Sequence, residues 1–282
     1  SIQYAASATV WVQSLSGAPH KNNGDILAFA PAFDEKNAQE ESDQVFRSAN
    51  IEVLPNLPGA TEEVQVLANN FEGTYFVGNE ATKTNFIAGA SGYGLLHLAT
   101  HGRLDSLNPF NSMLIFSSEG DSVEDALHVW EIYNLSFNAD LAVLSACETG
   151  TGKQEIGEGV ISIARAFQYA GCPAVVSSLW QVDDVATANI MQTFYSELSK
   201  GLPKDQALRK AKLSYLAKSD SRDSHPRYWA AFIGIGNFAP LQLREKPRSG
   251  LKWIVFGVGI ILMMTFLIKY VSNLASRSSA LS

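Results

Sequence analysis

The chain has 282 residues, of which 46% are hydrophobic and 17% charged, so it can bury a large core and is too apolar to be disordered. Its net charge is −7, and residues 1–243 carry 15 basic against 27 acidic side chains, which argues against binding nucleic acid through phosphate contacts. Two cysteines are too few for a disulfide framework, so we expect a reducing compartment.

The predicted elements alternate between strand and helix along the chain. Short apolar runs bounded by turn residues predict strands at 25–31, 74–77, 94–100, 113–116, 139–146, 174–180 and 229–235. Helical patterns cover 58–69, 81–90, 129–135, 158–170, 184–199 and 204–217. This alternation is typical of βαβ units and predicts an α/β fold with a mostly parallel central sheet.

The first predicted helix begins around Pro58 and Gly59. We interpret Thr61 as its N-cap and the acids Glu62 and Glu63 as first-turn charges that interact with the helix dipole. The chain itself opens at Ser1 without a methionine, which suggests the excised C-terminal part of a longer protein.

The C-terminal region predicts a membrane anchor. A polar linker at 240–250 precedes the apolar stretch 251–271, and a short polar tail follows at 272–282. At 1.5 Å per residue the stretch spans about 31 Å if Lys252 and Lys269 extend to the two interfaces. The excess of basic residues on its N-terminal side favours a cytoplasmic body. The alternative is a buried or interfacial helix, but the stretch has no polar face.

Two predicted strand ends carry groups suited to covalent catalysis. The strand at 94–100 leads into His101, and the strand at 139–146 leads into Cys147. Functional groups in parallel α/β sheets collect beyond the carboxyl ends of strands, so a thiol and an imidazole are expected together. The backbone amides of Gly102 and Cys147 are candidate oxyanion donors. The alternative is that the cysteine and the histidine only pack in the core.

Metal and nucleotide chemistry are not expected. His97 lies four residues before His101, but there is no HExxH pattern and no cysteine cluster, so we interpret His97 as structural. The segment at 147–154, CETGTGKQ, lacks the first glycine and the Ser/Thr of a phosphate-binding loop.

Five segments together resemble the bacterial CHAT domain, a caspase- and separase-like family of cysteine peptidases that is often fused to TPR repeats. They are HLATHG at 97–102, ADLAVLSACETG at 139–150, GEGVISIARAFQYAG at 157–171, SLWQVDD at 178–184 and HPRYWAAFIGIG at 225–236. The resemblance implies a caspase-like three-layer sandwich over 1–239, with His101 and Cys147 as the catalytic residues and no cofactor. The two residues are 46 apart, near the spacing of about 50 in caspases.

The resemblance also suggests how substrate binds. Trp180, Asp183 and Asp184 match a segment that contributes to the pocket for a basic P1 side chain in separases. The alternative is that Asp183 or Asp184 caps the following helix.

We therefore expect a single-pass, membrane-anchored cysteine endopeptidase with its peptidase domain in the cytoplasm. It would cleave a protein or peptide substrate and be activated by an upstream TPR or sensor region. The alternative function is a non-catalytic scaffold that binds a partner protein at the membrane.

Overall fold

The computed structural model describes residues 24–33, 54–105, 107–118, 125–145, 147–148, 158–180, 182–247 and 263–265. The chain divides into two compact units, 1–245 and 246–282. The predicted anchor at 251–271 lies outside the described residues except for 263–265, which are helical. Within the described part of the chain no helix combines the length and apolar composition that a membrane crossing requires. The predicted tail at 272–282 also lies outside the described residues.

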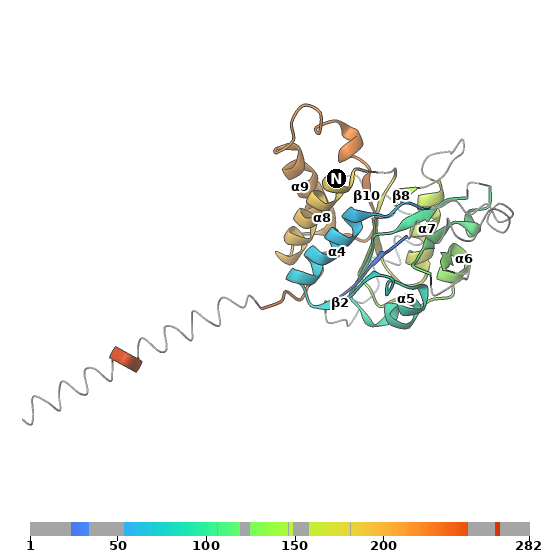
Figure 1. Cartoon of the computed structure of the whole chain (residues 1–282), viewed down its shortest axis with the longest axis horizontal. Helices are drawn as coiled ribbons and strands as arrows, with labels where there is room; N and C mark the ends of the chain where they lie inside the picture. The colour runs from blue at the N-terminus through green and yellow to red at the C-terminus, as the bar shows by residue number, and fades with distance from the viewer. Residues whose placement is uncertain are drawn as a thin grey trace, which may run out of the picture. The chain divides into compact units, whose positions relative to one another are not determined.

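A six-stranded sheet forms the centre of the first unit (Figure 1). Its order is β10 (Phe232–Gly236), β9 (Ala174–Ser178), β7 (Leu141–Leu144), β3 (Leu95–Leu98), β1 (Ile26–Pro31) and β2 (Gly73–Gly78). All neighbouring strands are parallel except β10, which runs antiparallel to β9. Every residue of β1, β3, β7 and β9 is buried, as expected for strands that are covered on both faces. The predicted α/β fold with a mostly parallel sheet is confirmed.

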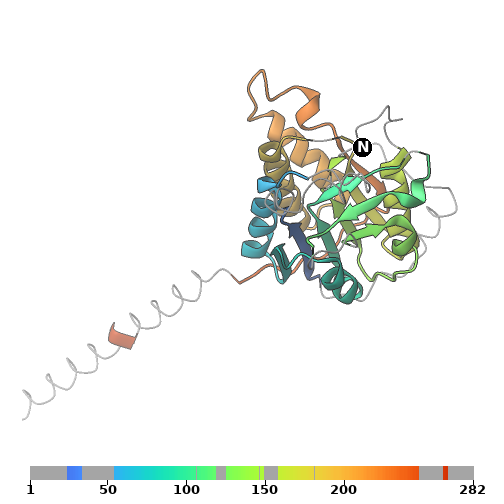
Figure 2. The ribbon, with the colours of Figure 1, turned by 45° about the vertical axis from the view of Figure 1, so that its right-hand side comes forward.

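Helices cover both faces of this sheet, which gives three layers (Figures 1 and 2). One layer contains α4 (Pro58–Asn70), α8 (Asp184–Ser199) and α9 (Lys204–Leu216), and the other contains α5 (Lys83–Gly89), α6 (Val129–Ile132) and α7 (Glu158–Tyr169). Strand β1 illustrates the arrangement, because Ile26 and Ala28 pack in the core under α4 and α8 while Leu27 and Phe29 pack under α5 and α7. Alternate residues of a strand thus point to opposite faces of the sheet and pack in two separate hydrophobic cores.

A second, smaller sheet lies beyond the carboxyl ends of β3 and β7. Its order is β6 (Ala126–His128), β5 (Met113–Ile115), β4 (His101–Arg103) and β8 (Cys147–Glu148). The predicted continuous strand at 94–100 is wrong at its end, because β3 stops at Leu98 and the chain enters the second sheet at His101. The hydroxyl of Thr100 donates to the carbonyl of Ile115, which fixes this change of sheet. His97 and His101 therefore belong to different sheets.

Helix α4 begins at Pro58, where the sequence predicts its start, but not with the cap that was expected. Its N-cap is Leu57, which makes no side-chain cap, and Pro58 occupies the first turn, where its missing N–H costs nothing. The interpretation of Thr61 as the N-cap is therefore wrong. Glu63 lies on the buried face of the helix, where 4% of its surface is exposed.

Residues 241–245 pack on the body of the first unit. Leu241 is buried, Glu245 forms a β-bridge with Phe71, and Arg244 forms an ion pair with Asp25 at 3.2 Å. The segment predicted as the start of a linker at 240–250 thus begins as part of the folded unit.

Candidate active site

His101 and Cys147 come together at one edge of the second sheet. Strands β4 and β8 pair in parallel, with His101 opposite Cys147 and Gly102 opposite Glu148. Each short strand follows one of two neighbouring strands of the large sheet, β3 and β7, which are themselves paired in parallel. Paired strands lie about 4.8 Å apart, so the two backbones are adjacent. The side chain of Cys147 lies outside what the structure describes.

The ring of His101 is held in one orientation. Its side chain has no exposed surface, and Phe33 packs against it edge to face with ring centroids 4.7 Å apart. Nε2 of His101 lies 2.7 Å from the carbonyl oxygen of Pro55. A carbonyl oxygen can only accept, so Nε2 carries the proton and donates it. In the neutral ring Nδ1 is then the basic nitrogen, and it has no hydrogen-bond partner among the described residues.

The surroundings of His101 favour its neutral form. Burial lowers the pKa of the ring, while the hydrogen bond to Pro55 and the negative charge of Asp184 raise it in part. The net direction is downward from the ordinary value of 6.5. A neutral imidazole at physiological pH can accept a proton, which is what a general base requires.

The residues predicted to bind substrate lie between the end of β9 and the first residue of α8. Asp183 is the N-cap of α8, and its carboxylate accepts hydrogen bonds from the amides of Val185 and Ala186, each at 3.1 Å. Asp184 accepts a bond from the amide of Gly59 at 3.3 Å. Asp183 therefore caps the helix, as the alternative interpretation of these acids expected. Asp184 is the acid whose negative charge raises the pKa of His101.

The third of these residues, Trp180, is half-buried and packs against the core under α4, α8 and α9. Its indole Nε1 donates to the carbonyl oxygen of Arg227 at 3.0 Å. This bond ties the end of β9 to the segment that leads into β10.

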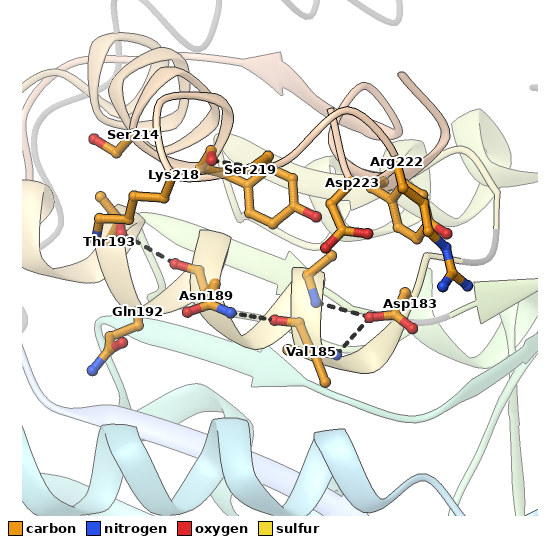
Figure 3. A pocket seen from close by; sticks show the side chains of 13 residues that line it. Asp183, Val185, Asn189, Gln192, Thr193, Ser214, Lys218, Ser219, Arg222 and Asp223 are labelled. Atoms are coloured by element: carbon orange, nitrogen blue, oxygen red, sulfur yellow. Dashed lines mark hydrogen bonds between the residues drawn. The ribbon is translucent and has the colours of Figure 1, made fainter. Parts of the chain in front are cut away.

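Asp183 also lines a polar cavity of about 440 Å³ (Figure 3). The lining comes from α8, the end of α9 and the segment after it, and comprises Asp183, Val185, Ala186, Asn189, Gln192, Thr193, Ser214, Tyr215, Lys218, Ser219, Arg222, Asp223 and Tyr228. Figure 3 shows the bonds by which Asp183 caps the first turn of α8 at one end of the cavity. The volume lies in the range of small-ligand sites, and the lining carries charges of both signs.

His97, which we interpret as structural, lies in the core and has polar neighbours that sequence reasoning missed. Its ring has no exposed surface. Nδ1 is 2.7 Å from the hydroxyl of Tyr195, and Nε2 is 3.3 Å from Oε1 of Glu63. Among the described residues no group of three or more His, Cys, Asp or Glu side chains is arranged to hold a metal ion.

Sequence reasoning also missed Pro55, which acts through its backbone carbonyl and therefore leaves no signal in residue type. Glu63 did leave a signal, because it shares one helical face with Ala60, Val64 and Leu67, which are all buried. The second cysteine, Cys172, is fully buried, its thiol lies 3.2 Å from the carbonyl of Ala174, and burial raises its pKa to about 12.

The chain is similar to a known protein family and to a known human protein. The family described as the CHAT domain matches residues 1–237. Human tetratricopeptide repeat protein 28 is 29% identical over 225 residues, which cover 68% of this chain and 9% of that protein. The chain therefore spans less than a tenth of this relative.

Two solved structures are also similar. The Arg-specific cysteine proteinase gingipain R matches 83% of this chain and 51% of its own, with 13% identity and a TM-score of 0.46. The separase–securin complex of Saccharomyces cerevisiae matches 84% of this chain and 14% of its own, with 18% identity and a TM-score of 0.44.

Proposed function

Because the chain belongs to the CHAT domain family, we propose that it is a cysteine endopeptidase with Cys147 as nucleophile and His101 as general base. The observation that carries the proposal is the register of β4 and β8, which sets His101 opposite Cys147 beyond the ends of β3 and β7. The carbonyl of Pro55 supports it, because that contact leaves Nδ1 of a buried, neutral ring as the basic nitrogen.

The proposed reaction proceeds through a thioester. Nδ1 of His101 accepts the proton of the Cys147 thiol, and the thiolate attacks the carbonyl carbon of the scissile peptide bond. The backbone amides of Gly102 and Cys147 donate to the oxyanion. The C–N bond then breaks, and the imidazolium gives its proton to the leaving amine. A water molecule, deprotonated by His101, hydrolyses the thioester and releases the acid product. No cofactor takes part.

The contact with Pro55 has a role in each half of this cycle. When His101 becomes an imidazolium, its Nε2–H bond to a carbonyl becomes charge-assisted and therefore stronger. The charge of Asp184 also favours the imidazolium. Both contacts stabilise the charged ring that forms only during the reaction.

We propose that substrate specificity resides at the end of β9 and the start of α8, with Trp180, Asp183 and Asp184 near a basic P1 side chain. Asp184 has the stronger support, because its charge acts on His101, whereas Asp183 caps α8. Replacing each acid with Asn keeps its hydrogen-bond acceptor and removes its charge. Loss of basic P1 preference in Asp184→Asn supports the assignment, with Glu62→Gln on the exposed side of α4 as control. An unchanged P1 profile in both Asp183→Asn and Asp184→Asn refutes it.

We further propose that the apolar stretch 251–271 anchors the chain in a membrane with the peptidase domain in the cytoplasm. The stretch is uncharged between Lys252 and Lys269, and basic residues are concentrated before it. The name of the human relative suggests TPR repeats in the longer protein, where they would act as the sensor region. Alkaline carbonate extraction tests the anchor: full-length protein should stay in the pellet, and protein ending at residue 247 should be released.

The test of peptidase function is covalent labelling. A peptidyl electrophile should modify Cys147 in the longer protein, and Cys147→Ala should abolish both labelling and cleavage of a proteome. Absence of both activities in the wild type, with and without candidate activating partners, would favour a non-catalytic scaffold that binds a partner protein.

A further inference from the structure

One buried carboxyl group touches both strands that lead to the proposed catalytic residues. Glu63, in α4, accepts a hydrogen bond from the hydroxyl of Ser145 at 3.1 Å. Ser145 follows the last residue of β7 and precedes Cys147 by two positions. The other oxygen of Glu63 faces His97 in β3, the strand that leads to His101. Glu63 therefore connects the ends of the two neighbouring strands from one side of the sheet.

This arrangement is costly as a purely structural device. Glu63 is 4% exposed and His97 is fully buried, and burying such groups without good partners is unfavourable. Oε1 of Glu63 and Nε2 of His97 are 3.3 Å apart, which is long for a hydrogen bond, and neither has a hydrogen-bond partner among the described residues. Apolar side chains of similar volume would pack here at least as favourably. Stability alone does not account for a carboxyl group at this position.

The charge state of the pair is consistent with a fixed, neutral contact. Burial raises the pKa of Glu63 to about 8, against the lowering effect of its bond to Ser145, and burial lowers the pKa of His97 to about 3. Both groups are then neutral near pH 7. A neutral carboxyl group accepts from Ser145 with one oxygen and presents a hydroxyl to His97 with the other.

We infer that Glu63 is a positioning residue of the proposed active site, which holds the segment carrying Cys147 in register with His101 through its contacts with Ser145 and His97. Its role in catalysis rests on the proposed function, whereas its control of the segment does not. Glu63 touches no substrate and acts through Ser145.

The experiment compares three changes that separate contact from packing. Glu63→Gln keeps both an acceptor for Ser145 and a donor for His97, so it should remain within about threefold of the wild type in alkylation of Cys147. Glu63→Leu keeps a side chain of similar size but is apolar and cannot accept the bond from Ser145, so it should slow alkylation about tenfold. Ser145→Ala removes the other end of the bond and should show a similar loss. Glu62→Leu, on the exposed side of α4, is the control.

The double variant Glu63→Leu/Ser145→Ala distinguishes a shared contact from two separate effects. If the contact is the cause, the double variant should alkylate no more slowly than Glu63→Leu alone. Losses that multiply, or an equal loss in Glu63→Gln and Glu63→Leu, would overturn the inference. Thermal melting of each variant establishes that the fold is intact.

Hydrogen exchange separates this inference from the proposed function. In Glu63→Leu and Ser145→Ala, exchange of the peptide containing residues 145–148 should accelerate about tenfold while that of α9 stays unchanged. Unchanged exchange at 145–148 would refute the positioning role even in an active enzyme. A wild type that neither labels nor cleaves would refute the peptidase, yet accelerated exchange would still show that Glu63 holds this segment.

Discussion

His101 and Cys147 occupy paired positions in the parallel β4–β8 ladder, although 46 residues separate them in the chain. Neither strand belongs to the central sheet, and each continues from one of its buried strands. The large sheet therefore fixes where the two segments begin, and the short ladder fixes how they face each other. A change in either sheet should therefore alter the relation between the proposed base and the proposed nucleophile.

Replacing His101 with Ala should lower kcat/KM by about 100- to 10,000-fold, because the proposed base is lost while the thiol remains. Measurement of peptide cleavage by the full-length protein checks this. The control is His128→Asn, since His128 occupies the N-cap position of α6 and asparagine is favoured at such positions. Equal losses in both variants would point to a general effect on folding instead of a base.

The acid limb of the pH profile should lie below pH 6.5, because the pKa of His101 is lowered from that value and the neutral ring is the active form. Asp184→Asn removes a negative charge that stabilises the imidazolium, so it should lower this pKa further. The acid limb should then move to lower pH, as measured by kcat/KM from pH 4 to 8. A shift to higher pH would contradict the assigned sign.

Glu63 and His97 should shape the pH dependence of stability. Between about pH 3 and 4.5 only His97 of this pair, with its pKa lowered from 6.5 to about 3, binds fewer protons in the folded state, so the contribution of the pair to stability rises with pH. Between pH 4.5 and 6.5 the raised pKa of Glu63 opposes this and the two effects cancel. From pH 6.5 to about 8 only Glu63 of this pair binds a different number of protons in the two states, and its contribution to stability should fall by about 2 kcal/mol.

The matched variant for this effect is Glu63→Gln, which cannot ionise. Its stability relative to the wild type should therefore increase between pH 6 and pH 8.5, as chemical denaturation at the two values would measure. A difference that stays constant with pH would mean that Glu63 does not titrate in this range in the folded protein.

Asp183→Ala should destabilise the fold by about 1 kcal/mol, because the amides of Val185 and Ala186 lose their acceptor at the start of α8. Asp183→Ser, which can cap, should recover most of this stability without recovering the charge. Denaturant titration gives the free energies of unfolding. Comparable losses in both variants would show that the charge matters more than the cap.

The sequence predicts the central parallel sheet better than it predicts where the chain leaves β3 for the second sheet. The apolar residues of the run at 94–100 continue through Ala99, past the end of β3 at Leu98, so residue type does not show where the strand ends. The break depends on the tertiary bond from Thr100 to Ile115, which local periodicity does not contain. The two proposed catalytic residues were found from the sequence because each directly follows an apolar run.

The contacts around these residues were harder to predict. Pro55 contributes only a carbonyl oxygen, which every residue has. Glu63 was interpreted as a first-turn acid because Thr61 looked like an N-cap, whereas the helix starts at Pro58. The position of Glu63 on the same helical face as Val64 and Leu67 predicts its burial correctly. The capping pattern does not, because a proline can start a helix without a side-chain cap.

The burial of Cys172 provides an internal reference for chemical work on this protein. The chain has two cysteines, and Cys172 is enclosed, with a thiol whose pKa is raised to about 12. Alkylation of Cys172 thus requires the fold to open, so its modification measures global unfolding in the same sample. The ratio of the Cys147 adduct to the Cys172 adduct in one mass spectrum would distinguish a variant in which Cys147 is less reactive from a variant that is only less stable.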